Sequence, residues 1–123
     1  MNAPRLTSRQ QAQAAYLQTV APKLDRMRSV IEQMGALQAD ETTIRAFTRS
    51  LDELKANTSA LNLSALAETA GLMSTLARRG GGIQMKVRGL RELWGSLKVN
   101  YEGALRQATT PEPAAGDGCP TGG

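Results

Sequence analysis

The chain has 123 residues, and its 15 Lys and Arg residues exceed its 11 Asp and Glu residues, which gives a net charge of +4. It contains no His, which excludes acid–base catalysis, metal binding and phosphorylation at an imidazole. The one cysteine, Cys119, excludes an internal disulfide. No apolar run approaches the roughly 18 residues of a membrane span, and no signal-peptide core is present. We therefore expect one cytoplasmic domain with no membrane partner.

The first third of the chain predicts two helices. Residues 1–7 are expected to fray. A short extra N-terminal helix, at about Ser8–Val20, should end or bend before Pro22, because proline disrupts a helix interior. A second helix begins at Pro22 and ends at Gly35. Its apolar stripe consists of Leu24, Met27, Ile31 and Met34.

Three further apolar stripes follow, each with helical spacing. Asp40 is a candidate N-cap for the first of them, which consists of Ile44, Phe47, Leu51, Leu54, Thr58 and Leu61. The next helix begins near Ser64, ends at Gly80–Gly82 and carries Leu63, Leu66, Ala70, Met73 and Leu76. The longest stripe consists of Ile83, Val87, Leu90, Trp94, Leu97, Tyr101 and Leu105.

These stripes predict an all-α fold, an antiparallel four-helix bundle over residues 8–108 that includes the short extra N-terminal helix. Residues 109–123 form a Gly/Pro-rich tail that is expected to be disordered. Three glycines weaken the last helix (Gly89, Gly95 and Gly103). We expect packing to hold that helix, with Trp94 as its anchor.

The middle of the chain contains the segment Leu54-Lys55-Ala56-Asn57, followed by Leu61-Asn62-Leu63 and Ala65-Leu66-Ala67-Glu68. This sequence resembles the histidine-containing phosphotransfer (HPt) family, and most closely the N-terminal phosphotransfer domain of chemotaxis histidine kinases. The helix stop at Arg78-Arg79-Gly80 also matches the chemotaxis version. The resemblance spans roughly residues 22–108 and implies an HPt-like bundle.

The chain departs from the HPt pattern at the residue that carries the chemistry. The phospho-accepting His falls on Asp52, which cannot form a phosphoimidazole, and the small Gly of the motif falls on Ala56. The junction Gly falls on Asn62, which also tolerates a left-handed helix end. Lys55 is retained, and in the family this Lys lies beside the phosphoryl group and faces the acidic pocket of a receiver domain.

The resemblance therefore implies a pseudo-HPt protein, without enzyme activity or cofactor, in a two-component or chemotaxis-like pathway. Its partner would be a response-regulator receiver domain or a histidine kinase. The expected partner-binding residues lie on one helix, away from its apolar stripe. They are Arg45, Thr48, Arg49, Asp52, Lys55, Ala56 and Ser59.

Other interpretations remain open. Asp52 can be a solvated helix carboxylate between Arg49 and Lys55. Glu53 and Asn57 have the four-residue spacing of the acid and amide that some helical receiver phosphatases use, which would make the protein an enzyme. A third possibility is a basic helical nucleic-acid-binding protein. We do not favour nucleic acid as the partner, because the cations of the last helix, Lys86, Arg88, Arg91, Lys98 and Arg106, are spread over several faces.

Overall fold

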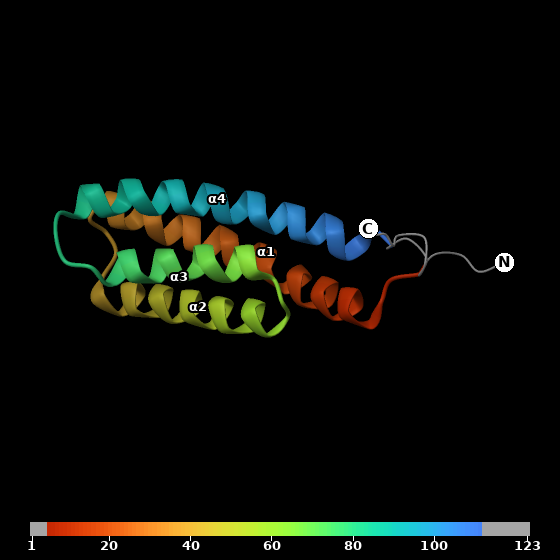
Figure 1. Cartoon of the computed structure of the whole chain (residues 1–123). Coiled ribbons are helices and arrows are strands. Elements are labelled where there is room, and N and C mark those ends of the chain that lie inside the picture. The colour runs from red at the N-terminus through yellow and green to blue at the C-terminus, as the bar shows by residue number, and fades with distance from the viewer. Residues whose placement is uncertain (1–4, 112–123) are drawn as a thin grey trace, which may run out of the picture.

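The computed structural model describes residues 5–111. These residues form four helices, α1 (Ser8–Gly35), α2 (Glu41–Ala60), α3 (Ser64–Arg78) and α4 (Ile83–Thr109), and no strand (Figure 1). α2 packs on α3, α4 packs on both α1 and α3, and α1 also touches α2. The predicted all-helical bundle is thus confirmed. Most of the predicted frayed N-terminus (1–7) and disordered tail (109–123) lies outside the described residues.

The prediction of a separate N-terminal helix is wrong, because α1 runs without interruption through Pro22. Proline removes one N–H donor and leaves the carbonyl of the residue four positions earlier without its helical partner. That residue is Gln18, and both Gln18 and Pro22 are exposed, so water can satisfy the freed carbonyl. The buried stripe also continues in phase across the proline through Leu17, Val20, Leu24, Met27, Ile31 and Met34.

The helix ends follow local sequence signals. The Asp40 side chain accepts a hydrogen bond from the Thr43 amide, which confirms the predicted N-cap of α2. Asn62 has a φ of 61° between α2 and α3, as the left-handed end predicted there requires. Thr7 and Gln10 form a capping box at the start of α1, with reciprocal bonds of 2.9 and 3.0 Å.

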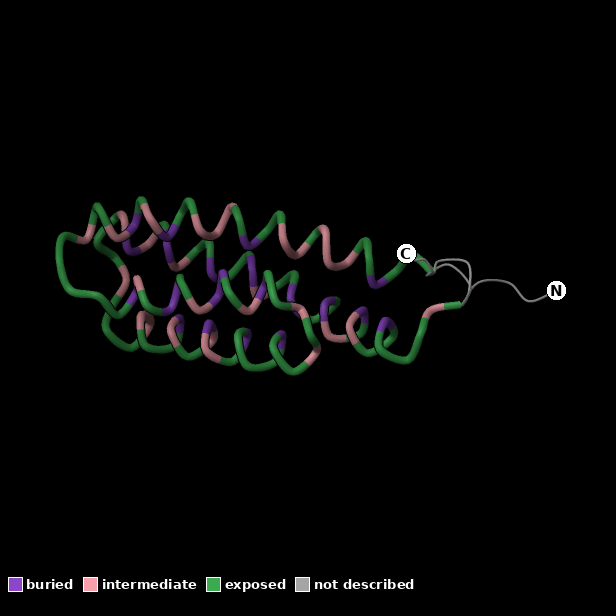
Figure 2. Tube along the Cα trace, viewed as in Figure 1, coloured by how far each residue is buried: buried purple, intermediate pink, exposed green. Residues whose placement is uncertain are grey.

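The core lies along the inner faces of all four helices, where the buried positions gather (Figure 2). The largest fully buried side chains include Leu17, Ile31, Leu51, Leu54, Leu66, Met73, Leu90 and Leu97. Trp94 is only partly buried, but its indole Nε1–H donates to the Leu24 carbonyl at 2.9 Å and so connects α4 to α1. Gly89 lets α3 approach α4 closely, since a Cβ at this position would lie 2.6 Å from Leu76 Cδ2.

Candidate docking surface

One side of α2 carries all seven residues predicted for partner binding. Its opposite side is buried through Phe47, Leu51, Leu54 and Thr58. Five of the seven predicted residues are exposed, namely Arg45, Arg49, Lys55, Ala56 and Ser59, and Thr48 and Asp52 are partly buried. We call this set the α2 docking face. The helix therefore brings the predicted residues together on a surface that another protein can reach.

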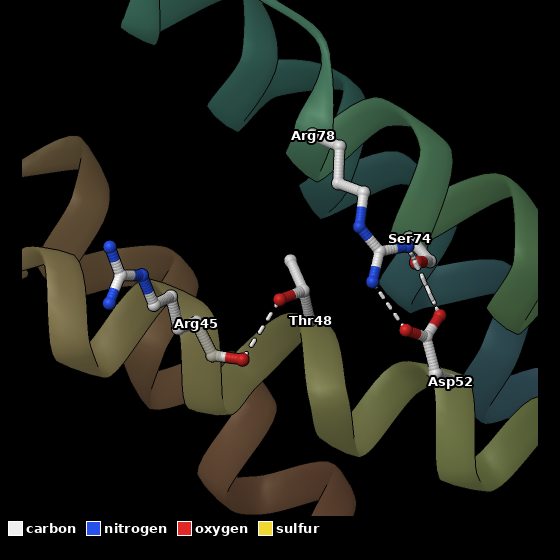
Figure 3. Close-up of polar contacts among 5 residues, drawn as sticks. All are labelled: Arg45, Thr48, Asp52, Ser74 and Arg78. Carbon is white, nitrogen blue, oxygen red and sulfur yellow. Dashed lines mark hydrogen bonds and ion pairs between the residues drawn. The ribbon is translucent and has the colours of Figure 1, made fainter.

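Asp52 lies at the boundary between α2 and α3, where two α3 side chains hold its carboxylate (Figure 3). The Ser74 hydroxyl donates to Oδ1 at 2.7 Å. The Arg78 guanidinium donates to both carboxylate oxygens, through Nη1 to Oδ1 at 3.2 Å and through Nη2 to Oδ2. The partner of Asp52 thus comes from the neighbouring helix, whereas the sequence suggested Arg49 and Lys55 on the same helix.

The electrostatics of this cluster favour the ionised carboxylate. Hydrogen bonds from Arg78 and then from Ser74 lower the pKa of Asp52 below its usual 3.8, and the charges of Arg78 and Lys55 lower it further. The same contact raises the pKa of the Arg78 guanidinium. Asp52 is therefore a neutralised anion near pH 7, and it does not present an unpaired negative charge to a partner.

Lys55 lies across the surface of α3 at Gly71. A Cβ added at Gly71 would lie 3.3 Å from Lys55 Cδ and 3.5 Å from its Nζ, so the missing side chain leaves room for the lysine stem. The ammonium group remains at the exposed surface, close enough to Asp52 to lower the pKa of that carboxyl. Lys55 is thus positioned by α3 as well as by its own helix.

The N-terminal part of the α2 docking face has its own local contacts. Arg45 forms an ion pair with Glu41 one turn earlier, and its guanidinium points away from the Asp52–Arg78 pair (Figure 3). The Thr48 hydroxyl donates to the Arg45 carbonyl at 2.8 Å. Arg49 has no ion pair or hydrogen bond of its side chain within residues 5–111. Arg49 and Lys55 are therefore the exposed cations of this face that no carboxylate holds in an ion pair.

Sequence reasoning missed the three α3 residues that complete this surface, Gly71, Ser74 and Arg78. A signal for them existed, because they recur at steps of three and four and so share one side of α3. On that side, small and polar residues lie beside the apolar stripe of α3. This composition suits the flank of a helix that packs against α2. The spacing does not give the register between α2 and α3, and this register determines that Arg78 reaches Asp52.

Glu53 and Asn57, the pair proposed for receiver dephosphorylation, are both exposed on α2. They lie near Tyr16 of α1, whose hydroxyl is buried and has no hydrogen-bond partner among the described residues. Burial raises the pKa of Tyr16 above 10.0, the Asn57 amide lies close enough to oppose this shift without reaching hydrogen-bond geometry, and the Glu53 charge reinforces it. The Lys23 ammonium lies 5.7 Å from the centre of the Tyr16 ring.

A groove of about 530 Å³ separates α1 from α2 on the side of Glu53. Its lining combines apolar side chains, such as Met27 and Phe47, with the charged side chains of Lys23, Arg26 and Glu53. The lining residues are Lys23, Arg26, Met27, Val30, Thr42, Thr43, Ala46, Phe47, Ser50 and Glu53. Within the described residues, no three His, Cys, Asp or Glu side chains come together as a metal site would require. No helix in residues 5–111 has the length and hydropathy needed to cross a membrane.

The chain was compared with family models, curated proteins and solved structures. No family model, curated protein or solved structure matches it.

Proposed function

We propose that this protein is an HPt-like antiparallel bundle that binds a response-regulator receiver domain or a histidine kinase without carrying phosphate. The observation that supports this most directly is the state of Asp52. In the segment that resembles the HPt family, this residue takes the position of the phospho-accepting His. Its carboxylate is held by Ser74 and Arg78. Because the chain contains no His, it has no imidazole that could carry a phosphoryl group. The carboxylate that stands in its place is already engaged by Ser74 and Arg78.

The charge of the surface supports an acidic partner. Arg78 neutralises Asp52, and Arg49 and Lys55 remain exposed beside this pair. Receiver domains have carboxylate-rich active sites, so their acidic pocket complements these cations and would be steered toward them. Had Asp52 been unpaired, its charge would have opposed the approach of such a pocket.

The shape of the surface supports close docking. Ala56 is exposed and small, and Gly71 keeps the Lys55 stem low on α3. A partner helix or loop can therefore approach the backbone of α2 between Asp52 and Ser59. We infer that the protein sequesters its partner or competes with a true phosphotransfer protein for it, in the cytoplasm, where two-component signalling reactions take place.

Binding to receiver domains tests this proposal. The receiver domains and histidine kinases of the source organism would be titrated against the full chain by calorimetry. The charge reversal Lys55→Glu and the bulky substitution Ala56→Trp are each expected to weaken binding about tenfold or more. Matched controls are Arg106→Glu and Ala15→Trp, at exposed positions on α4 and α1. If no receiver or kinase binds, or if neither α2 variant weakens binding, the proposal is wrong.

The same receivers separate docking from catalysis. In its phosphorylated form, a bound receiver should lose phosphate no faster with the protein than without it. A faster loss that Asn57→Ala abolishes would instead identify a receiver phosphatase acting through Glu53 and Asn57. A phosphorylated receiver that is protected or unaffected agrees with sequestration.

A further inference from the structure

A second surface with the features of a binding site lies between α1 and α4. α4 runs along the opposite side of the bundle from α2, so this surface is separate from the α2 docking face (Figure 1). At its centre is Trp94, which is partly exposed. The Arg28 guanidinium of α1 lies 5.4 Å from the centre of the indole ring, and the Lys98 ammonium lies 5.5 Å from it.

The surface around the tryptophan is hollowed. One hollow of about 340 Å³ is lined by Arg28, Ile31, Glu32, Arg91, Trp94 and Gly95. A second hollow of about 390 Å³ is lined by Gln84, Met85, Arg88, Arg91 and Glu92. Arg91 lines both hollows, so they adjoin each other on the surface of α4, and we call the two together the trough. A Cβ added at Gly95 would meet no atom within 4 Å, so the trough is open at the tryptophan.

The cations of this trough are incompletely neutralised. Arg91 makes a two-pronged ion pair with Glu32, with distances of 3.0 and 2.8 Å. Arg28, Arg88 and Lys98 have no carboxylate within ion-pair distance in the described part of the chain. Beside the first hollow, the unpaired cations Arg28 and Lys98 flank the Trp94 ring, and the second hollow is lined by the unpaired Arg88 and by Met85, which is 72% exposed. Trp, Arg and Met are the residues enriched where proteins bind one another.

We propose that this trough, defined by Arg28, Met85, Arg88, Arg91, Trp94 and Lys98, binds an acidic peptide segment of a partner protein. An apolar side chain of the peptide would lie on the exposed edge of the Trp94 ring, and its carboxylates would pair with Arg28, Arg88 and Lys98. The proposal does not depend on the function of the α2 docking face. Together the two surfaces would let the protein hold two partners at once, on opposite sides of the bundle.

The charges favour a peptide over a nucleic acid or a second copy of the chain. Glu32 and Glu92 line the trough among the cations, so a continuous phosphate backbone would meet carboxylates along its path. A short peptide can place its few acidic residues opposite the cations alone. Two copies joined through this face would bring their unpaired cations together, which opposes self-association.

The experiment selects the peptide directly. A displayed library of random 12-residue peptides is panned against the full chain, and the enriched peptides are synthesised with a fluorescent label. We expect enrichment in Asp and Glu together with an apolar residue, and binding measured by anisotropy. Trp94 is the single tryptophan of the chain, so its emission should also change when the peptide binds.

Charge reversals then locate the site. The double variant Arg28→Glu/Lys98→Glu is expected to weaken the selected peptides about tenfold or more, because two attractive contacts become repulsive. Arg106→Glu, a reversal at an exposed position further along α4, should leave their affinity within about twofold of the wild type. Circular dichroism and the Tm establish that each variant folds, and Lys98→Glu alone serves if the double variant does not.

Three outcomes would overturn the proposal. One is a selection that yields no binder or no acidic enrichment. Another is equal affinity for the wild type and the charge-reversed variant. The third is a 20-nucleotide single-stranded DNA that binds tightly at physiological salt and loses its affinity in Arg28→Glu/Lys98→Glu, which would assign the trough to nucleic acid.

Discussion

The carboxylate of Asp52 on α2 is held by the guanidinium of Arg78 on α3, although the two residues lie 26 positions apart in the sequence. Ser74 completes the contact, since its hydroxyl donates to Asp52 and accepts from Arg78. Asp52, where the resemblance to HPt domains predicted the position of the phospho-accepting His, thus joins two helices. A partner bound beside Asp52 would therefore also lie against α3.

The Asp52–Arg78 contact predicts a stability that depends on acid pH. Because Arg78 and Ser74 lower the pKa of Asp52, the folded protein keeps this carboxyl ionised at pH values where the unfolded chain binds a proton. The contact therefore stabilises the fold above the usual pKa of 3.8, and this contribution is lost as the pH falls through the lowered value. Urea unfolding between pH 6 and pH 3 should show that Asp52→Asn is less stable near neutrality and falls less steeply in acid.

Carbon NMR of the Asp52 carboxyl gives the direct test. Its titration midpoint should lie below 3.8 in the wild type and should move back toward 3.8 in Arg78→Ala. Arg79→Ala, which removes the exposed neighbour of Arg78, should leave the midpoint in place. An unchanged midpoint in Arg78→Ala would show that this arginine does not hold the carboxylate in solution.

The sequence predicted the helices well because their signals are local. The Asp40 N-cap, the left-handed Asn62 and the buried stripes each depend on residues within one or two turns of each other. The predicted break at Pro22 is absent because the buried stripe keeps its phase on both sides, and this packing outweighs the local cost of one proline. The Asp52–Arg78 pair could not be predicted, because it depends on the register of two helices, which packing of the whole core determines.

Pro22 should lower the stability of α1, so replacing this proline should raise the free energy of unfolding. Pro22→Ala restores the N–H donor to the Gln18 carbonyl and removes the clash of the ring with that turn, at an exposed position where the methyl group contacts little. The free energy of unfolding should rise by about 1–3 kcal/mol, measured by urea denaturation. The matched reverse change, Ala15→Pro, should lower it by about 3 kcal/mol. A neutral or destabilising Pro22→Ala would indicate that α1 is interrupted at this point in solution.

Two glycines of α4 should respond differently to alanine. Gly103 has no atom within 4 Å of an added Cβ, so Gly103→Ala should stabilise the helix by about 0.5–1 kcal/mol. An added Cβ at Gly89 would lie 2.6 Å from Leu76 Cδ2, so Gly89→Ala gains the same propensity but displaces Leu76 from its place against α4. Thermal unfolding should therefore give a lower Tm for Gly89→Ala than for Gly103→Ala. In a Leu76→Ala background, where the obstructing atoms are absent, the two alanines should have equal effects.

Gln10 connects the first turn of α1 to the last turn of α4. Its buried side-chain amide donates to the carbonyls of Gln107 and Thr110 at 2.9 and 2.7 Å, where a helix end leaves carbonyls without helical partners. Gln10→Glu replaces this donor with a carboxylate that faces the same carbonyls, so we expect a loss of about 1–3 kcal/mol and faster amide exchange in the last turn of α4. Gln11→Glu is the matched control, because this neighbour is exposed and, within residues 5–111, its side chain donates a hydrogen bond only to the Leu6 carbonyl. Equal exchange rates in the two variants would mean that the end of α4 is held by its apolar contacts, such as Ala108, and not by the amide.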